Sequence, residues 1–268
     1  MEQALRIAVL IDAENISSKY IKLIIDEVTG FGTPTYKRVY GNFTNSSVSA
    51  WQEELRAYAL TPVFQFNYTK GKNASDSAII IDAMDILYSG RVDGFCLVTS
   101  DSDFTKLALR LREAGMLVIG MGEQKTPGSL VSACETFKFL DLLYSTSGED
   151  NEEESVVEDN TRERSGRKKA TPSKKQIRRE IKSIIDAKGD EEGWTDLSII
   201  GNLLSQRVPG FDPRNYRFNK LGKMIESYND FEMKKLVNEK NELIQFYFRV
   251  KEDPSQKKRT SVEILSNE

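Results

Sequence analysis

Four aspartates lie where strands are expected to end or a helix to begin, which are positions where carboxylates can bind metal. They are Asp12, Asp76, Asp101 and Asp103. The first follows the apolar run 5–11, the last two follow the apolar run 94–98, and Asp76 falls in the first turn of a helix expected over 74–88. If the two apolar runs are neighbouring strands, we expect all four carboxylates to meet at one crevice.

Clustered carboxylates repel one another and raise each other's pKa unless a cation lies between them. Hard oxygen ligands favour Mg²⁺ or Mn²⁺. Such a site can activate water and stabilise an in-line phosphoryl displacement without histidine. The four aspartates therefore predict a divalent-metal site for phosphodiester hydrolysis, in which they are both the metal ligands and the catalytic groups.

An aspartate after a strand also has an ordinary structural use, as a helix cap or a turn residue. Asp103 can simply cap a helix that begins at Phe104. Asp82 belongs to the same predicted helix as Asp76, but it lies about 240° further round the helix axis. Asp82 is therefore a second-rank candidate, and a solvated polar edge explains it as well.

Polar neighbours of these aspartates are candidates for substrate binding. Asn15 either orients a metal-bound water or contacts phosphate, or it caps a helix that begins at Ile16. Lys72 either contacts phosphate or is a solvated loop lysine. Ser100, like Thr99 before it, either donates a hydrogen bond to phosphate or satisfies backbone groups of the turn.

Composition excludes several other chemistries. The sequence has 268 residues, of which none is histidine and two are cysteine. A Ser-His-Asp triad, a Cys-His pair and a His-ligated zinc site are therefore ruled out. Cys96 and Cys134 form neither a CxxC motif nor a disulfide framework, so we expect both to be buried as small hydrophobic residues.

Apolar runs alternate with helical patterns over residues 1–145. We expect strands over 5–11, 34–40, 62–66, 94–98, 116–120 and 137–139, and helices over 16–28, 48–60, 74–88, 104–114 and 130–135. This alternation predicts an α/β fold with a mainly parallel sheet. Right-handed crossovers place the loops that follow the strands on one edge, where such folds bind ligands.

Charge is unevenly distributed along the chain. Residues 1–147 carry 14 Lys+Arg and 17 Asp+Glu, residues 148–160 carry 7 acids and no base, and residues 161–268 carry 24 bases and 17 acids. An acidic run beside a basic region with few apolar residues predicts a disordered linker over 146–173. Two domains follow, 1–145 and 174–251, with a polar tail over 252–268.

The second domain has the pattern of a small α+β winged helix. We expect helices over 174–188, 197–208 and 213–225, then a two-stranded wing over 231–237 and 244–250 joined at 238–241. Trp194 is expected in the core of this domain.

Four basic residues lie on or beside the third of these helices, and they are Arg214, Arg217, Lys220 and Lys223. At 100° per residue they form a broad basic flank. This flank either contacts phosphates of RNA or is merely a solvated face. Tyr216 and Phe218 can stack on bases, although the helical spacing of Tyr216 is also typical of a core residue.

Three motifs resemble the NYN family, a branch of the PIN-like nuclease superfamily. They are Ile11-Asp-Ala-Glu-Asn15, Lys72-Asn-Ala-Ser-Asp76 and Thr99-Ser-Asp-Ser-Asp-Phe104. The resemblance spans nearly all of residues 5–143. It implies a PIN-like (Rossmann-like) fold and a metal-dependent ribonuclease, with divalent metal held by Asp12, Asp76, Asp101 and Asp103 and supported by Asn15. This sequence has Thr99-Ser100 where a Ser-Gly pair is common in the family. The absence of that glycine reduces the conformational freedom of the backbone in the turn, but the aspartates of the motif are retained.

The segment 210–221, Gly-Phe-Asp-Pro-Arg-Asn-Tyr-Arg-Phe-Asn-Lys-Leu, resembles the LOTUS (OST-HTH) family. The resemblance covers about residues 174–251. It implies binding to RNA, including structured or G-rich RNA, and some relatives bind protein partners instead.

Together these patterns favour a two-domain ribonuclease that depends on Mg²⁺ or Mn²⁺ and delivers RNA through its winged helix. The alternatives are a catalytically silent RNA-binding regulator and a scaffold that holds a protein partner. No apolar run approaches the roughly 20 residues that cross a bilayer, and the N-terminal residues lack the pattern of a signal peptide. We therefore expect no membrane association and a cytoplasmic location.

Overall fold

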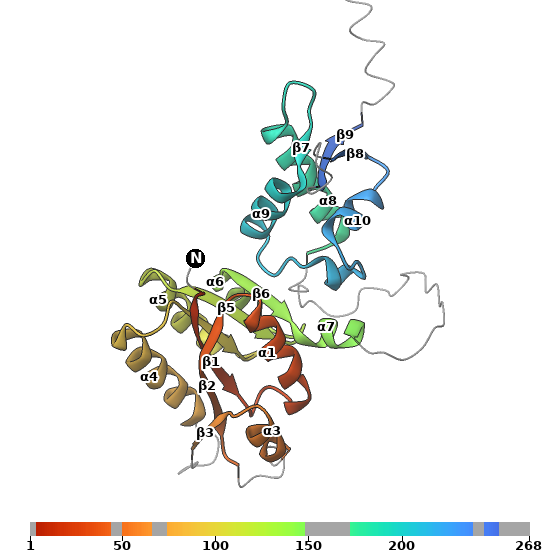
Figure 1. Cartoon of the computed structure of the whole chain (residues 1–268). Helices are drawn as coiled ribbons and strands as arrows, with labels where there is room; N and C mark the ends of the chain where they lie inside the picture. Colours follow the sequence, from red (N-terminus) through yellow and green to blue (C-terminus); the bar gives the residue numbers. More distant parts are fainter. Residues whose placement is uncertain (1–3, 44–49, 66–73, 148–171, 238–243, 252–268) are drawn as a thin grey trace, which may run out of the picture. The chain divides into compact units, whose positions relative to one another are not determined.

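The computed structural model describes residues 4–43, 50–65, 74–147, 172–237 and 244–251, which form two compact units (Figure 1). The first boundary between the units along the chain falls after Pro172. Most of the predicted linker, the whole predicted tail and Lys72 lie outside the described residues.

The first unit is an α/β domain, as the sequence predicted. Its strands are β1 (Arg6–Asp12), β2 (Thr33–Gly41), β3 (Thr61–Phe64), β4 (Gly94–Val98), β5 (Leu117–Gly122) and β6 (Thr136–Phe139). Its helices are α1 (Ile21–Thr29), α3 (Trp51–Ala57), α4 (Ala74–Ser89), α5 (Thr105–Glu113), α6 (Gly128–Ala133) and α7 (Leu140–Ser147), with the short 3₁₀ helices η1 (Ser18–Tyr20) and η2 (Ser102–Phe104).

The six strands form one parallel sheet in the order β3-β2-β1-β4-β5-β6. Strand β1 therefore lies at the centre, hydrogen-bonded to β2 on one side and to β4 on the other. Ile11 of β1 is paired with Val98 of β4, so the residues that follow these two strands emerge side by side. The strand order reverses at this point, which is where open parallel sheets bind their ligands.

Alternate residues of β1 are buried on opposite faces of the sheet. Ile7, Val9 and Ile11 belong to the core that contains the apolar residues of α1 and α3. Ala8 and Leu10 belong to the core that contains those of α4 and α5. Burial on both faces explains why the strand is a continuous apolar run in the sequence. It also fixes the position of the strand end, where Asp12 lies.

The first unit departs from the sequence prediction in two places. The helix expected over 16–28 begins only at Ile21, because residues 18–20 form the separate 3₁₀ helix η1. Helix α7 was not predicted at all. It follows β6 without a turn residue, and Leu140 and Leu143 provide its buried contacts. The expected burial of Cys96 and Cys134 is confirmed.

The second unit is an α+β domain with a small antiparallel sheet. Its elements are α8 (Lys174–Lys188), β7 (Thr195–Asp196), α9 (Leu197–Arg207), α10 (Leu221–Glu226), β8 (Phe231–Val237) and β9 (Ile244–Val250). Residues 209–215, which include most of the 3₁₀ helix η3 (Pro213–Tyr216), group with the first unit. The sheet order is β7-β9-β8. Strand β7 was missed in the sequence, because a pair of residues is too short to show alternation. The helical stripe of α8 is confirmed, since its four isoleucines are buried.

The prediction of one continuous helix over 213–225 was wrong. Arg217 has a φ of 67°, and Lys220 is extended with φ −145° and ψ 143°. Both conformations interrupt the helical hydrogen-bond ladder. Arg214 therefore lies in η3 and Lys223 lies in α10, so the basic residues do not share the face of a single helix.

Trp194 is half-buried rather than a core residue, so that expectation was also wrong. The ammonium of Lys234 lies 5.6 Å from the centroid of its ring, and the guanidinium of Arg249 lies 4.6 Å from it. These distances are typical of cation–π contacts.

The end of β5 packs against the end of β4 so closely that only glycine fits at position 122. A Cβ atom on Gly122 would lie 2.6 Å from the carbonyl oxygen of Thr99. We expect Gly122→Ala to lower the free energy of unfolding of the first unit by about 1–3 kcal/mol, because a backbone must shift. Urea unfolding, followed by the fluorescence of the buried Trp51 in a Trp194→Phe background, measures this.

Gly128→Ala is the matched control, because a Cβ there meets nothing within 4 Å and the residue begins helix α6. We expect this control to be neutral or slightly stabilising. Equal losses from the two substitutions would contradict the close approach at Gly122.

Candidate metal centre

Asp12 ends β1 and is held in place by four hydrogen bonds. Its Oδ2 accepts from the side-chain amide of Asn15 (2.6 Å) and from the hydroxyl of Thr99 (3.0 Å). Its Oδ1 accepts from the backbone N–H groups of Glu14 (3.1 Å) and Asn15 (3.3 Å). Burial raises the pKa of Asp12, and these hydrogen bonds oppose that rise. The carboxylate is thus oriented by the loop that follows its own strand and by the end of β4.

Asp101 caps η2, while Asp103 lies within that short helix. The Oδ1 of Asp101 accepts from the backbone N–H of Asp103 (2.9 Å), and its own N–H donates to the hydroxyl oxygen of Thr99 (3.2 Å). A helix cap is therefore present at this position. The capping residue is Asp101, whereas the sequence suggested Asp103 as one alternative. Asp101 and Asp103 thus both lie directly after the end of β4.

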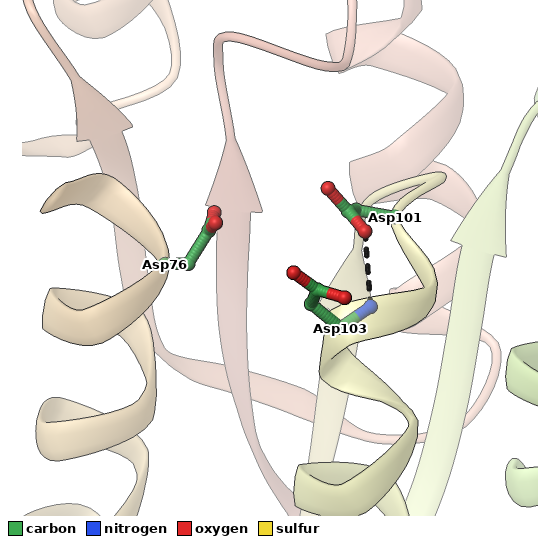
Figure 2. Close-up of side chains that lie close together, drawn as sticks. All are labelled: Asp76, Asp101 and Asp103. Atoms are coloured by element: carbon green, nitrogen blue, oxygen red, sulfur yellow. Dashed lines mark hydrogen bonds between the residues drawn. The ribbon is translucent and has the colours of Figure 1, made fainter. Parts of the chain in front are cut away.

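Asp76 approaches this pair from the first turn of α4. One carboxylate oxygen from each of Asp76, Asp101 and Asp103 lies within 4.8 Å of the others (Figure 2). Asp76 is 9% exposed. Its burial, and then the negative charges of its neighbours, raise the pKa of Asp76 to about 6. The charges that contribute are those of Asp12, Asp101, Asp103 and Glu14, in that order.

The donor set fits a hard divalent cation. Three carboxylates offer oxygen atoms to a common point, and their mutual repulsion is relieved when a cation lies between them. Among the described residues Asp12 is not part of this group of three, although its charge acts on Asp76. Asp12 lies at the end of β1, and its role as a metal ligand stays a prediction.

The predicted neighbours of the aspartates have different surroundings. Asn15 binds Asp12, as described above. Ser100 is buried, and its hydroxyl oxygen accepts from the backbone N–H of Glu123 (2.9 Å), which ties the loop after β5 to the end of β4. Asp82 lies away from the cluster and pairs with Arg38 and Tyr40. Lys72 lies outside the described residues.

Glu14 has a role that the sequence did not predict, and Thr99 satisfies a backbone group of the turn, which was one of its two predicted roles. Glu14 Oε2 accepts from the hydroxyl of Ser75 (2.9 Å), which joins the loop after β1 to the start of α4. Thr99 bridges Asp12 and the backbone of Asp101. Both residues lie inside the strand-end motifs, and this position was the feature of the sequence that could have indicated their roles.

The four basic residues that the sequence predicted as phosphate contacts divide into two classes. Arg214 donates to both carboxylate oxygens of Asp212, at 3.1 and 2.8 Å, and Lys223 pairs with Glu226 at 3.0 Å. Arg217 and Lys220 are exposed, and no ion pair holds either within the described part of the chain. These two residues are therefore the better placed for an anionic ligand.

Comparison with known families agrees with this geometry. Residues 6–142, slightly more than half of the chain, match the NYN domain. The chain belongs to the NYN family. This NYN domain is followed by an OST-HTH/LOTUS domain at residues 172–242. NYN domains belong to a nuclease superfamily, and OST-HTH/LOTUS domains are known to bind RNA.

No protein with a curated description matches the sequence. Among solved structures, a protein of unknown function from Vibrio parahaemolyticus RIMD 2210633 is similar, with 19% identity and a TM-score of 0.44. The match covers 51% of this chain and 93% of that one. Within the described residues, no helix combines the length and apolarity needed to span a membrane.

Asp76→Asn tests the repulsion within the cluster. Because the native pKa of Asp76 is raised to about 6, the native state loses stability as the pH rises from about 4 through 6. We expect the substitution to stabilise the metal-free protein by about 1 kcal/mol at pH 7.5, and to have little effect at pH 4. Urea unfolding in EDTA at both pH values measures the difference.

Asp85→Asn, on the exposed side of the same helix, is the control and should show no such dependence on pH. A stabilisation by Asp76→Asn that is the same at both pH values would argue against carboxylate repulsion.

Proposed function

We propose that this protein is a divalent-metal-dependent ribonuclease whose second domain binds RNA, with domains at 1–145 and 174–251 joined by the charged segment 146–173. The observation that carries the proposal is the convergence of three carboxylates at the switch point of an NYN-family sheet. The donor set favours Mg²⁺ or Mn²⁺. The reaction is hydrolysis of a phosphodiester bond.

Asp76, Asp101 and Asp103 would hold the metal, with Asp12 as a further proposed ligand. When bound, a divalent cation at such a site supplies activation of water and stabilisation of the charge on the phosphoryl oxygens. Asp12 contributes negative charge beneath the cluster, and Asn15 and Thr99 keep its carboxylate oriented. Without a cation, Asp76 retains its proton up to about pH 6, so protons compete with metal for this carboxylate.

Contacts to the substrate are proposed on both domains. Lys72, in the segment that leads into α4, is proposed to contact phosphate beside Asp76. Asn15 and Ser100 line the same strand ends, although Ser100 also has a structural role. In the second domain, Arg217 and Lys220 are proposed as phosphate contacts, with Lys223 and Arg214 contributing where their carboxylate partners release them. Structured or G-rich RNA is the proposed ligand.

Asp101→Asn tests the catalytic proposal. The amide oxygen can still accept from the N–H of Asp103, so the fold of the turn is retained while one anionic ligand is removed. We expect cleavage of end-labelled RNA in Mg²⁺ or Mn²⁺ to fall by at least about 100-fold, while RNA binding is unchanged.

Asp85→Asn is the matched control and should cleave at the wild-type rate. Cleavage that persists in EDTA, or in purified Asp101→Asn protein, would refute the metal site. RNA that is bound but never cut by the wild type would instead support the catalytically silent regulator.

The double substitution Arg217→Ala/Lys220→Ala tests the RNA-binding proposal for the second domain. Loss of two phosphate contacts should weaken binding about tenfold at low salt and reduce the slope of log K against log[salt] by about 1.4–1.8. Filter binding over a salt series, in the Asp101→Asn background, measures both. Arg179→Ala/Lys182→Ala, which removes two exposed charges from α8, is the control. An equal effect of the two double substitutions would place the RNA elsewhere.

A further inference from the structure

Lys19, Tyr20 and Tyr144 form a compact cation–aromatic group in the first unit. The rings of Tyr20 and Tyr144 pack edge to face, with centroids 5.5 Å apart and an interplanar angle of 84°. The ammonium of Lys19 lies 4.8 Å from the centroid of Tyr20 and 5.5 Å from that of Tyr144. One lysine thus contacts two rings that come from segments far apart in the sequence.

The group presents one ring and one cation to solvent. Tyr20 is buried and its hydroxyl donates to Glu123 (3.3 Å), so it anchors the group. Tyr144 is 46% exposed, and Lys19 is exposed as well. Among the residues that the structure describes, no carboxylate forms an ion pair with Lys19. Its charge therefore remains accessible to an external anion.

Hydrogen bonds connect this group to the end of β4, within the same unit. Tyr20 belongs to η1, which follows the end of β1 at Asp12. Its partner Glu123 follows β5 and donates its backbone N–H to Ser100, the residue before Asp101. Two hydrogen bonds, from Tyr20 to Glu123 and from Glu123 to Ser100, therefore connect the ring pair to the strand end that carries Asp101.

The nearby carboxylates already have partners. Glu123 pairs with the ammonium of Lys125 at 2.8 Å, in addition to its contact with Tyr20. Asp141 accepts from the backbone N–H of Gln124. Lys125 is itself well exposed, with 60% of its side chain accessible. These contacts leave Lys19 without a carboxylate partner among the described residues.

We propose that Lys19 and Tyr144 form a binding site for single-stranded RNA beside the metal centre. A base stacks on the exposed ring of Tyr144, and Lys19 contacts an adjacent phosphate. Aromatic rings bind bases of unpaired RNA in this way, and lysines supply the electrostatic contact to the backbone. The site rests on the proposed ribonuclease function, because its role is to hold the strand on the β5 side of the metal centre.

The test measures the binding of a short fluorescent single-stranded RNA to the full chain. The background substitutions are Asp101→Asn, which prevents cleavage of the RNA, and Arg217→Ala/Lys220→Ala, which reduces binding by the second domain. We expect Tyr144→Ala to weaken binding about tenfold or more, as for loss of one stacked base. Tyr144→Phe should retain the affinity because the ring is kept. Lys19→Ala should lower the salt slope by about 0.7.

Tyr88→Ala is the matched control, since this tyrosine is 75% exposed on α4 and outside the group. Equal affinities for Tyr144→Ala and Tyr88→Ala, or a loss in Tyr144→Phe as large as in Tyr144→Ala, would overturn the proposed site. Wild-type cleavage is assayed separately. If the wild type cleaves RNA and Tyr144→Ala binds RNA normally, the proposed site is rejected and the proposed nuclease activity stands. If Tyr144→Ala weakens binding and the wild type does not cleave RNA, the site stands and the nuclease activity is rejected.

Discussion

Electrostatic repulsion among carboxylates at one edge of the sheet is the constraint on which the rest of the structure depends. Asp76 is both buried and surrounded by negative charge, and its pKa rises to about 6 in consequence. A fold that keeps such groups together must stabilise them through other contacts. Asp12 is held by four hydrogen bonds and Asp101 serves as a helix cap, so each charge has a place in the local hydrogen-bond network.

The scaffold meets this constraint through the centre of a parallel sheet. Strand β1 is buried on both faces and paired with β4, which brings Asp12 beside Thr99. The loop after β5 is then tied to Ser100, and Gly122 permits the close approach. Asp76 arrives from a different layer, on the first turn of α4. Its position depends on the packing of that helix against the sheet, through residues such as Ile79 and Ala83.

Each of the two units contains an aromatic side chain that lies against basic groups. The pairings are Tyr144 with Lys19 in the first unit, and Trp194 with Lys234 and Arg249 in the second. The environments differ, because Arg249 is also paired with Glu232 whereas Lys19 has no ion pair among the described residues. The group in the first unit is connected through Glu123 and Ser100 to the strand end that carries Asp101.

The sequence by itself determined the α/β class, the six strands, most helices, the three strand-end aspartates and Asp76 at the start of a helix, because local periodicity and short motifs encode these features directly. The tertiary structure decided which carboxylates converge, since that depends on the packing of α4 against β1 and β4. It also gave Asp82 its partners Arg38 and Tyr40, left Trp194 at the surface and broke the helix around Arg217. Each of these outcomes is set by contacts between distant segments or by backbone geometry that no periodic pattern records.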